Sequence, residues 1–169
     1  MTGHPLRRDL MQRAAELEPF TAQVRTMDHP DYDFAWILWE EGDWRGSCER
    51  IERLSVRAER VGDYSSLSFL LADMCECDVL DYHPERAEER LDRAERVVRV
   101  TAQQTALAHV LAWRVFLQSR LGDADGALSA AEAGFEVIGA TGWEMGRAWI
   151  HSNLAVMELS RGDPGAAHG

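Results

Sequence analysis

The sequence predicts an all-α fold: a right-handed α-solenoid of about four helix-turn-helix repeats, preceded by one extra helix. Three columns of residues with a shared 40-residue period predict this fold. Turn pairs recur at Gly42-Asp43, Tyr82-His83, Gly122-Asp123 and Gly162-Asp163. Five positions after the start of each pair stands a small residue: Ser47, Ala87, Ala127 and Ala167. Seven positions before it stands another compact residue: Ala35, Cys75, Val115 and Ala155. Such a period is typical of stacked units that bury their apolar faces against their neighbours.

The chain is expected to begin with an amphipathic helix over residues 6–24. The Asp-His-Pro-Asp stretch at 28–31 separates this helix from the first repeat, because these residues favour turns. The first repeat is then expected over 33–64, with helices over 33–41 and 45–61.

The second repeat is expected over 65–104, with helices over 67–80 and 84–100. Pro84 fits the first turn of the second of these helices, where its missing N–H does no harm. Acidic residues stand four positions before arginines in this helix, an arrangement typical of a solvated helix face.

The third repeat is expected over 105–142, with helices over 105–120 and 124–138. Gly122 between them tolerates the left-handed conformation that ends a helix, and Asp123 can cap the next one.

The last repeat, over 143–169, is incomplete, although residues 1–169 are expected to form a single domain. Natural solenoids end in a polar capping element, and this repeat has only a few residues of its second helix. We therefore expect the chain to be a segment of a longer protein. The apolar face over 149–159 could also pair with a second copy, which would give a homo-oligomer.

Composition narrows the function classes. The net charge is −11, and all 18 basic residues are arginine. Without lysine there is no P-loop lysine and no Schiff-base lysine, and an acidic surface repels the phosphates of nucleic acids. No stretch reaches 18 apolar residues and no secretory signal is visible, so we expect no membrane partner and a cytoplasmic location. No catalytic constellation converges, so neither an enzyme nor a cofactor is expected.

The three cysteines, Cys48, Cys75 and Cys77, are an odd number without paired spacing. This indicates reduced thiols in a reducing compartment. Residues two apart on a helix point about 200° apart, so Cys75 and Cys77 cannot both bind one metal ion on an intact helix. The sequence therefore predicts no metal site, and Cys75 is expected to be a packing residue.

Two helices joined by a Gly-Asp turn, with a small residue on each helix twelve positions apart, resemble the tetratricopeptide repeat. The standard unit has 34 residues, so the 40-residue unit here resembles a divergent variety with longer helices. Its signature aromatic and Leu-Gly positions are missing.

Four stretches resemble the helical-repeat region of large ATP-binding LuxR-type transcriptional regulators of actinobacteria. They are ERVGDYSSLSFLLA at 59–72, ATGW at 140–143, GRAW at 146–149 and LSRGDPGAAH at 159–168. In that family the repeat region lies between a nucleotide-binding ATPase and a helix-turn-helix domain, and it restrains the protein or receives an inducer. The resemblance implies a sensor or protein-interaction segment. The alternative is a free-standing tetratricopeptide adaptor with no role in transcription.

The tetratricopeptide resemblance also implies that the first helix of each repeat lines a concave groove. Counting from the compact residue of each first helix places an aromatic strip there, and aromatic anchors suit a peptide or apolar ligand. The groove-binding candidates are Tyr32, Trp36, Trp39, Phe69, Glu76, His109, Phe116, Arg120, Trp149 and Ser152. The partner would be a protein or peptide, or a small-molecule inducer. The alternative is that longer helices turn these rings into core between repeats.

Overall fold

Left-handed residues end the helices of this protein at a fixed interval. The computed structural model describes residues 8–17 and 25–162. Within these ranges a positive φ occurs every 20 residues, and each such residue lies just after the end of a helix. The seven residues are Gly42, Gly62, Tyr82, Ala102, Gly122, Gly142 and Gly162.

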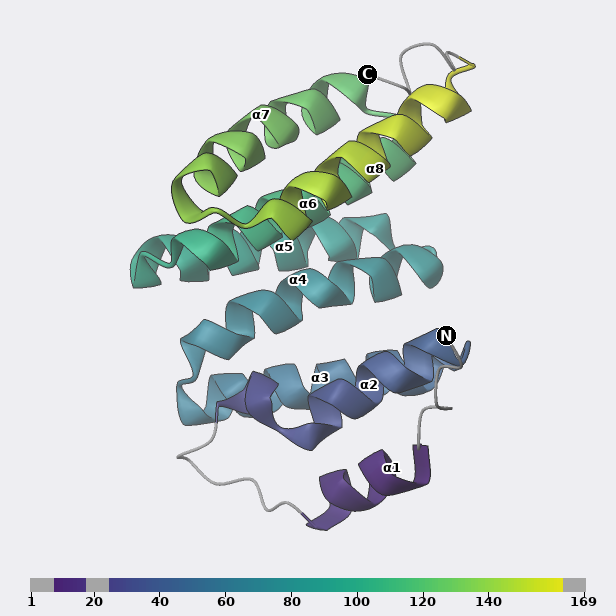
Figure 1. The fold of residues 1–169 in the computed structure, drawn as a ribbon, viewed down its shortest axis with the longest axis vertical. Coiled ribbons are helices and arrows are strands. Elements are labelled where there is room, and N and C mark those ends of the chain that lie inside the picture. Colours follow the sequence, from purple (N-terminus) through teal and green to yellow (C-terminus); the bar gives the residue numbers. More distant parts are fainter. Residues whose placement is uncertain (1–7, 18–24, 163–169) are drawn as a thin grey trace.

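The described residues form an all-α fold in which no strand occurs, as the sequence predicts. The elements are α1 (Arg8–Leu17), the short 3-10 helix η1 (Thr26–Asp28), α2 (Pro30–Glu40), α3 (Trp44–Val61), α4 (Tyr64–Leu80), α5 (Pro84–Thr101), α6 (Gln104–Leu121), α7 (Ala124–Thr141) and α8 (Glu144–Ser160). Figure 1 shows them following one another along the long axis, from α1 at one end to α7 and α8 at the other.

Aspartates cap three of these helices. The carboxylates of Asp43, Asp63 and Asp123 accept hydrogen bonds from the backbone N–H three residues further on, at 3.0 or 3.1 Å. These bonds satisfy N–H groups that have no partner inside the helix. The cap predicted at Asp123 is therefore confirmed.

Several helix bounds differ from those expected. α2 begins at Pro30, because Nδ1 of His29 accepts a hydrogen bond from the Asp31 N–H and so caps the helix. α4 begins at Tyr64, directly after its Asp63 cap. α7 continues through Gly139 to Thr141, since the left-handed residue is Gly142. Of the leading helix expected over 6–24, the structure describes 8–17; the rest of that prediction lies outside the described residues.

Small residues allow the helices to approach closely. Ala35, Cys75 and Val115 are fully buried, as are Ala87 and Ala127 on the second helices. Ser47 is buried too, whereas Ala155 is half-buried and Ala167 lies outside the described residues. The two sets of small residues therefore lie at contacts between helices from Ala35 to Ala127.

The core lies along α4 and α6. α4 packs against α3, α5 and α6, and α6 packs against α4, α5, α7 and α8. Both helices are apolar on nearly all sides, as is expected of a helix surrounded by others. At the other end of the stack, α1 has no buried residue and contacts α2 through Met11.

The prediction that all three cysteines are reduced is wrong. Cys48 of α3 and Cys77 of α4 form a disulfide, with Cα atoms 5.8 Å apart, and Cys75 is the free, buried cysteine. The two residues are 29 positions apart, and only the packing of α3 on α4 brings them together. Spacing along the sequence does not show this proximity. The cysteines therefore no longer support the inference of a reducing compartment.

Across the described part of the chain, no helix has both the length and the apolar character needed to cross a bilayer.

Candidate aromatic binding groove

One groove is lined by four alternate helices, α2, α4, α6 and α8. Its volume is about 590 Å³, which lies within the range of small-molecule sites. Its walls come from η1 and α2, from α4, from α6, and from the start of α8 with the residue before it. The lining residues are Met27, Tyr32, Trp36, Phe69, Asp73, Glu76, Thr105, His109, Trp113, Trp143, Met145 and Trp149. We call this set the aromatic groove.

Six of the ten groove-binding candidates line the aromatic groove. They are Tyr32, Trp36, Phe69, Glu76, His109 and Trp149. The packing of the helices therefore brings together residues that are more than 100 positions apart in the sequence.

The other four candidates lie elsewhere. Trp39 is partly buried and packs against the main core cluster. Phe116 is buried, with its ring edge-on to Trp113 at 5.2 Å between centroids. The Arg120 guanidinium stacks over the Phe116 ring at 5.1 Å. Ser152 is exposed and does not line the groove. For Phe116 the alternative interpretation, a ring in the core, is the one the structure bears out.

A buried carboxylate organises the floor of the groove. The Asp73 side chain is 1% exposed, and the Tyr32 hydroxyl donates a hydrogen bond to its Oδ2 at 2.8 Å. Nε2 of His109 lies 2.8 Å from Oδ1, and the Trp113 indole N–H donates to the same oxygen at 3.2 Å. Three side chains from α2 and α6 thus converge on one residue of α4.

Counting along the sequence does not find Asp73 and Trp113. Both stand two positions before the compact residue of their helix, and the two are 40 residues apart. The tetratricopeptide resemblance does not place residues at this position, two before the compact residue, in the groove. A usable signal is present, because Asp73 is the one charged residue in the otherwise apolar stretch 69–75 of α4. A buried carboxylate requires hydrogen-bond donors, and this requirement points to a polar site.

Aromatic rings surround His109. Its ring lies 4.9 Å from that of Phe69, 5.8 Å from Trp143 and 5.9 Å from Trp149, measured between centroids. Trp149 in turn lies edge-on to Trp113 at 4.5 Å. Such ring pairs stabilise a fixed arrangement beyond their burial, so the rings form a largely pre-formed surface.

Two groove residues have shifted pKa values. Burial raises the pKa of Glu76 to about 7, although the nearby Arg120 charge acts in the opposite direction. Burial, followed by the negative charge of Asp73, raises the pKa of the Tyr32 hydroxyl. Tyr32 therefore keeps its proton and remains a donor to Asp73, while Glu76 changes charge near neutral pH.

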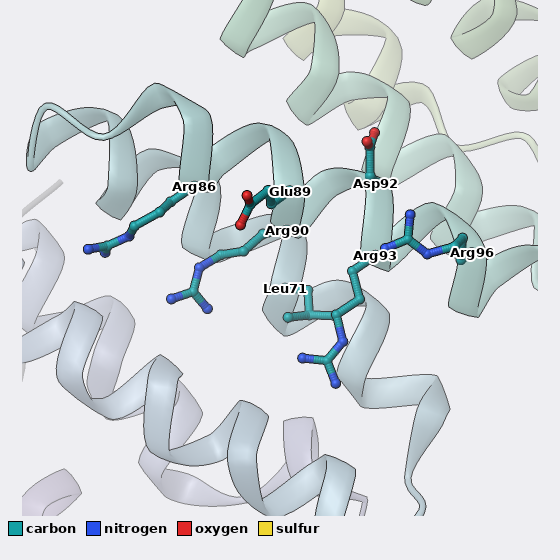
Figure 2. Close-up of a pocket in the computed structure, with 7 residues that line it drawn as sticks. All are labelled: Leu71, Arg86, Glu89, Arg90, Asp92, Arg93 and Arg96. Carbon is teal, nitrogen blue, oxygen red and sulfur yellow. The ribbon is translucent and has the colours of Figure 1, made fainter.

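A second cavity, of about 550 Å³, lies along α5. Its lining residues, labelled in Figure 2, are Leu71, Arg86, Glu89, Arg90, Asp92, Arg93 and Arg96. Figure 2 shows Arg86, Arg90 and Arg93 extending from one side of α5. Arg86 and Arg90 form ion pairs with the fully buried Asp78 of α4, and Arg93 pairs with Glu59 of α3. Arg90 also pairs with Glu52 of α3. Because Arg86, Arg90 and Arg93 already have carboxylate partners, we interpret this cavity as an ion-pair network between helices.

The described residues contain no group of three His, Cys, Asp or Glu side chains placed to hold a metal ion. In the aromatic groove the polar atoms belong to Asp73, Glu76, His109, Tyr32 and Thr105, among indole and thioether side chains. This arrangement suits non-covalent binding by ring contacts and hydrogen bonds.

Comparisons with family models, with curated proteins and with solved structures found no match for this chain.

Proposed function

We propose that this chain is the sensor segment of a LuxR-type transcriptional regulator and that it binds a partner or inducer in the aromatic groove. The observation that carries the proposal is the groove itself, which is walled by aromatic side chains from α2, α4, α6 and α8. Trp36 is 36% exposed and Met145 is 73% exposed, so part of the wall is accessible to a ligand. The regulatory context is supported by the sequence stretches at 59–72, 140–149 and 159–168.

In this proposal the helix pairs form a tetratricopeptide-like solenoid with a 40-residue period. The regular 20-residue spacing of the left-handed residues supports it, because two helices then make one repeat. A ligand that contacts α2, α4, α6 and α8 at once would favour one relative placement of these helices. Such differential contact is what lets a ligand shift a conformational equilibrium in neighbouring domains.

The test is a pair of chromosomal substitutions in the full-length gene. Trp36→Ala removes an exposed groove ring, and Trp44→Ala removes a ring of α3 that does not line the groove. We expect several-fold changes in a set of transcripts with Trp36→Ala only, and unchanged far-UV circular dichroism for both purified variants. Unchanged transcripts, together with loss of a protein partner from Trp36→Ala, would favour the free-standing adaptor. Equal behaviour of the two variants in both assays would contradict a binding role for the groove.

A further inference from the structure

Aromatic side chains line the aromatic groove on several sides. Six rings of Tyr, Phe or Trp line it: Tyr32, Trp36, Phe69, Trp113, Trp143 and Trp149. The face of such a ring is negative, so it attracts a cation placed over it, and tryptophan does so most strongly. Apolar substituents on the same ligand would contact these rings and the Met27 and Met145 side chains.

The formal charges in the groove are negative. Asp73 and Glu76 line it, and among the described residues that do so only His109 can carry a positive charge. The chain has 18 arginines, yet in the part that the structure describes none of them lines this groove. The Arg120 charge acts on Glu76 and lowers its pKa, while Asp33 adds a further negative charge near Tyr32.

Asp73 receives hydrogen bonds from Tyr32 and Trp113, whose donor groups are neutral, and Nε2 of His109 lies 2.8 Å from its Oδ1. These contacts fix the position of the carboxylate. The groove thus sets two carboxylates, Asp73 and Glu76, against the single imidazole of His109, so a cation in the groove would be attracted there.

We propose that the aromatic groove binds a small organic cation, an ammonium group that carries apolar substituents. The inference deepens the proposed binding role of the groove and depends on it. The rings solvate the cation, Asp73 and Glu76 balance its charge, and a volume of about 590 Å³ accommodates a ligand of drug-like size. An anionic ligand of the same shape would be repelled by both carboxylates.

The experiment uses three probes of similar size: benzyltrimethylammonium, neutral 2-phenylethanol and anionic phenylacetate. Binding to the intact chain is measured at pH 8, where Glu76 is charged, by tryptophan fluorescence and isothermal titration calorimetry. We expect the cation to bind about tenfold more tightly than the neutral probe, and phenylacetate not to bind.

Variants then assign the site. Asp73→Asn should weaken cation binding by about tenfold or more, because it removes the buried charge. If that variant does not fold, Glu76→Gln provides the second measurement. We expect it to lower the affinity for the cation several-fold and to leave the affinity for 2-phenylethanol unchanged. Trp44→Ala should bind all probes as the unaltered chain does.

Equal binding of the three probes, or binding that Glu76→Gln and Asp73→Asn leave unchanged, would overturn the cation proposal. Trp36-dependent binding of 2-phenylethanol or phenylacetate without binding of the cation would also overturn it, while still supporting a ligand groove. If none of the probes binds, the cation proposal fails, and the transcript measurement decides the proposed function independently.

Discussion

At the scale of single residues, the same register position has different surroundings along the chain. Trp36 and Phe116 each stand one position after the compact residue of their helix, yet Trp36 is 36% exposed and Phe116 is 6% exposed. α6 is packed between α4, α5, α7 and α8, whereas α2 packs against α1, η1 and α3 and reaches α4 through the Tyr32 side chain. A repeat period predicts which face a residue occupies. It does not predict how many neighbouring helices cover that face.

Tyr32, Trp36, Phe69, Glu76, His109 and Trp149 were therefore predictable as groove residues, but Asp73, Trp113 and Trp143 were not. Tyr32 and His109 follow from the register, since counting from a compact residue places both of them. Their common partner Asp73 lies one position away from the counted column, and its role depends on the contact between α4 and α6. That contact is a property of packing, which a single sequence does not report.

Glu76 makes stability depend on pH. Its pKa in the folded chain is about 7, compared with an ordinary value of 4.5. As pH rises from about 4.5 to 7, the unfolded chain loses this proton while the folded chain keeps it, so the stabilising contribution declines and is lost above about pH 7. We expect the free energy of unfolding to fall by up to about 3 kcal/mol across this range, as measured by urea denaturation.

Glu76→Gln should remove this component of the pH dependence, because the amide resembles the protonated acid at every pH. Glu136→Gln is the matched control, since Glu136 is exposed on α7. A Glu76→Gln profile that parallels that of the unaltered chain would contradict the assigned pKa.

At the scale of elements, the helices were predicted with small errors at their ends. Seven of the expected helices correspond to α2 through α8, and the errors arise where a cap decides the bound, as with Asp63 before α4 and Gly142 after α7. A run of apolar residues fixes the middle of a helix. Its ends depend on hydrogen bonds that the apolar pattern does not contain.

Tyr82 and Ala102 adopt left-handed conformations, with φ of 62° and 54°, at positions where the other turns have glycine. A Cβ atom makes this conformation unfavourable. Tyr82 is 90% exposed and Ala102 is exposed, so neither side chain loses much burial when it is removed. We expect Tyr82→Gly and Ala102→Gly each to stabilise the chain by about 1 kcal/mol. Thermal and urea denaturation measure the change.

Gly122→Ala provides the opposite substitution at an equivalent turn. The φ of Gly122 is 76° and nothing lies within 4 Å of the added Cβ, so the change tests backbone conformation alone. We expect it to destabilise the chain by about 1 kcal/mol. Stabilisation by this change, or destabilisation by the two glycine substitutions, would show that the turns are not the source of strain.

At the scale of the whole molecule, burial is unequal along the stack. α1 contributes no buried residue and packs on α2, whereas most of α4 and much of α6 are buried between other helices. Helices with few buried apolar contacts open with low free energy. We expect hydrogen exchange, followed by mass spectrometry, to be at least about a hundredfold faster in α1 than in the centres of α4 and α6. Protection of α1 equal to that of α4 would contradict this distribution of contacts.

The Cys48–Cys77 disulfide joins α3 to α4, and α4 supplies Phe69, Asp73 and Glu76 to the groove. The two helices therefore cannot separate while the bond is intact, whatever occupies the groove. If the groove adjusts to ligands of different size, α6 and α8 or α2 must move relative to α4. Under reducing conditions the disulfide is broken, and this covalent limit on the separation of α3 and α4 is removed. The redox state of the surroundings therefore sets how far these two helices can move apart.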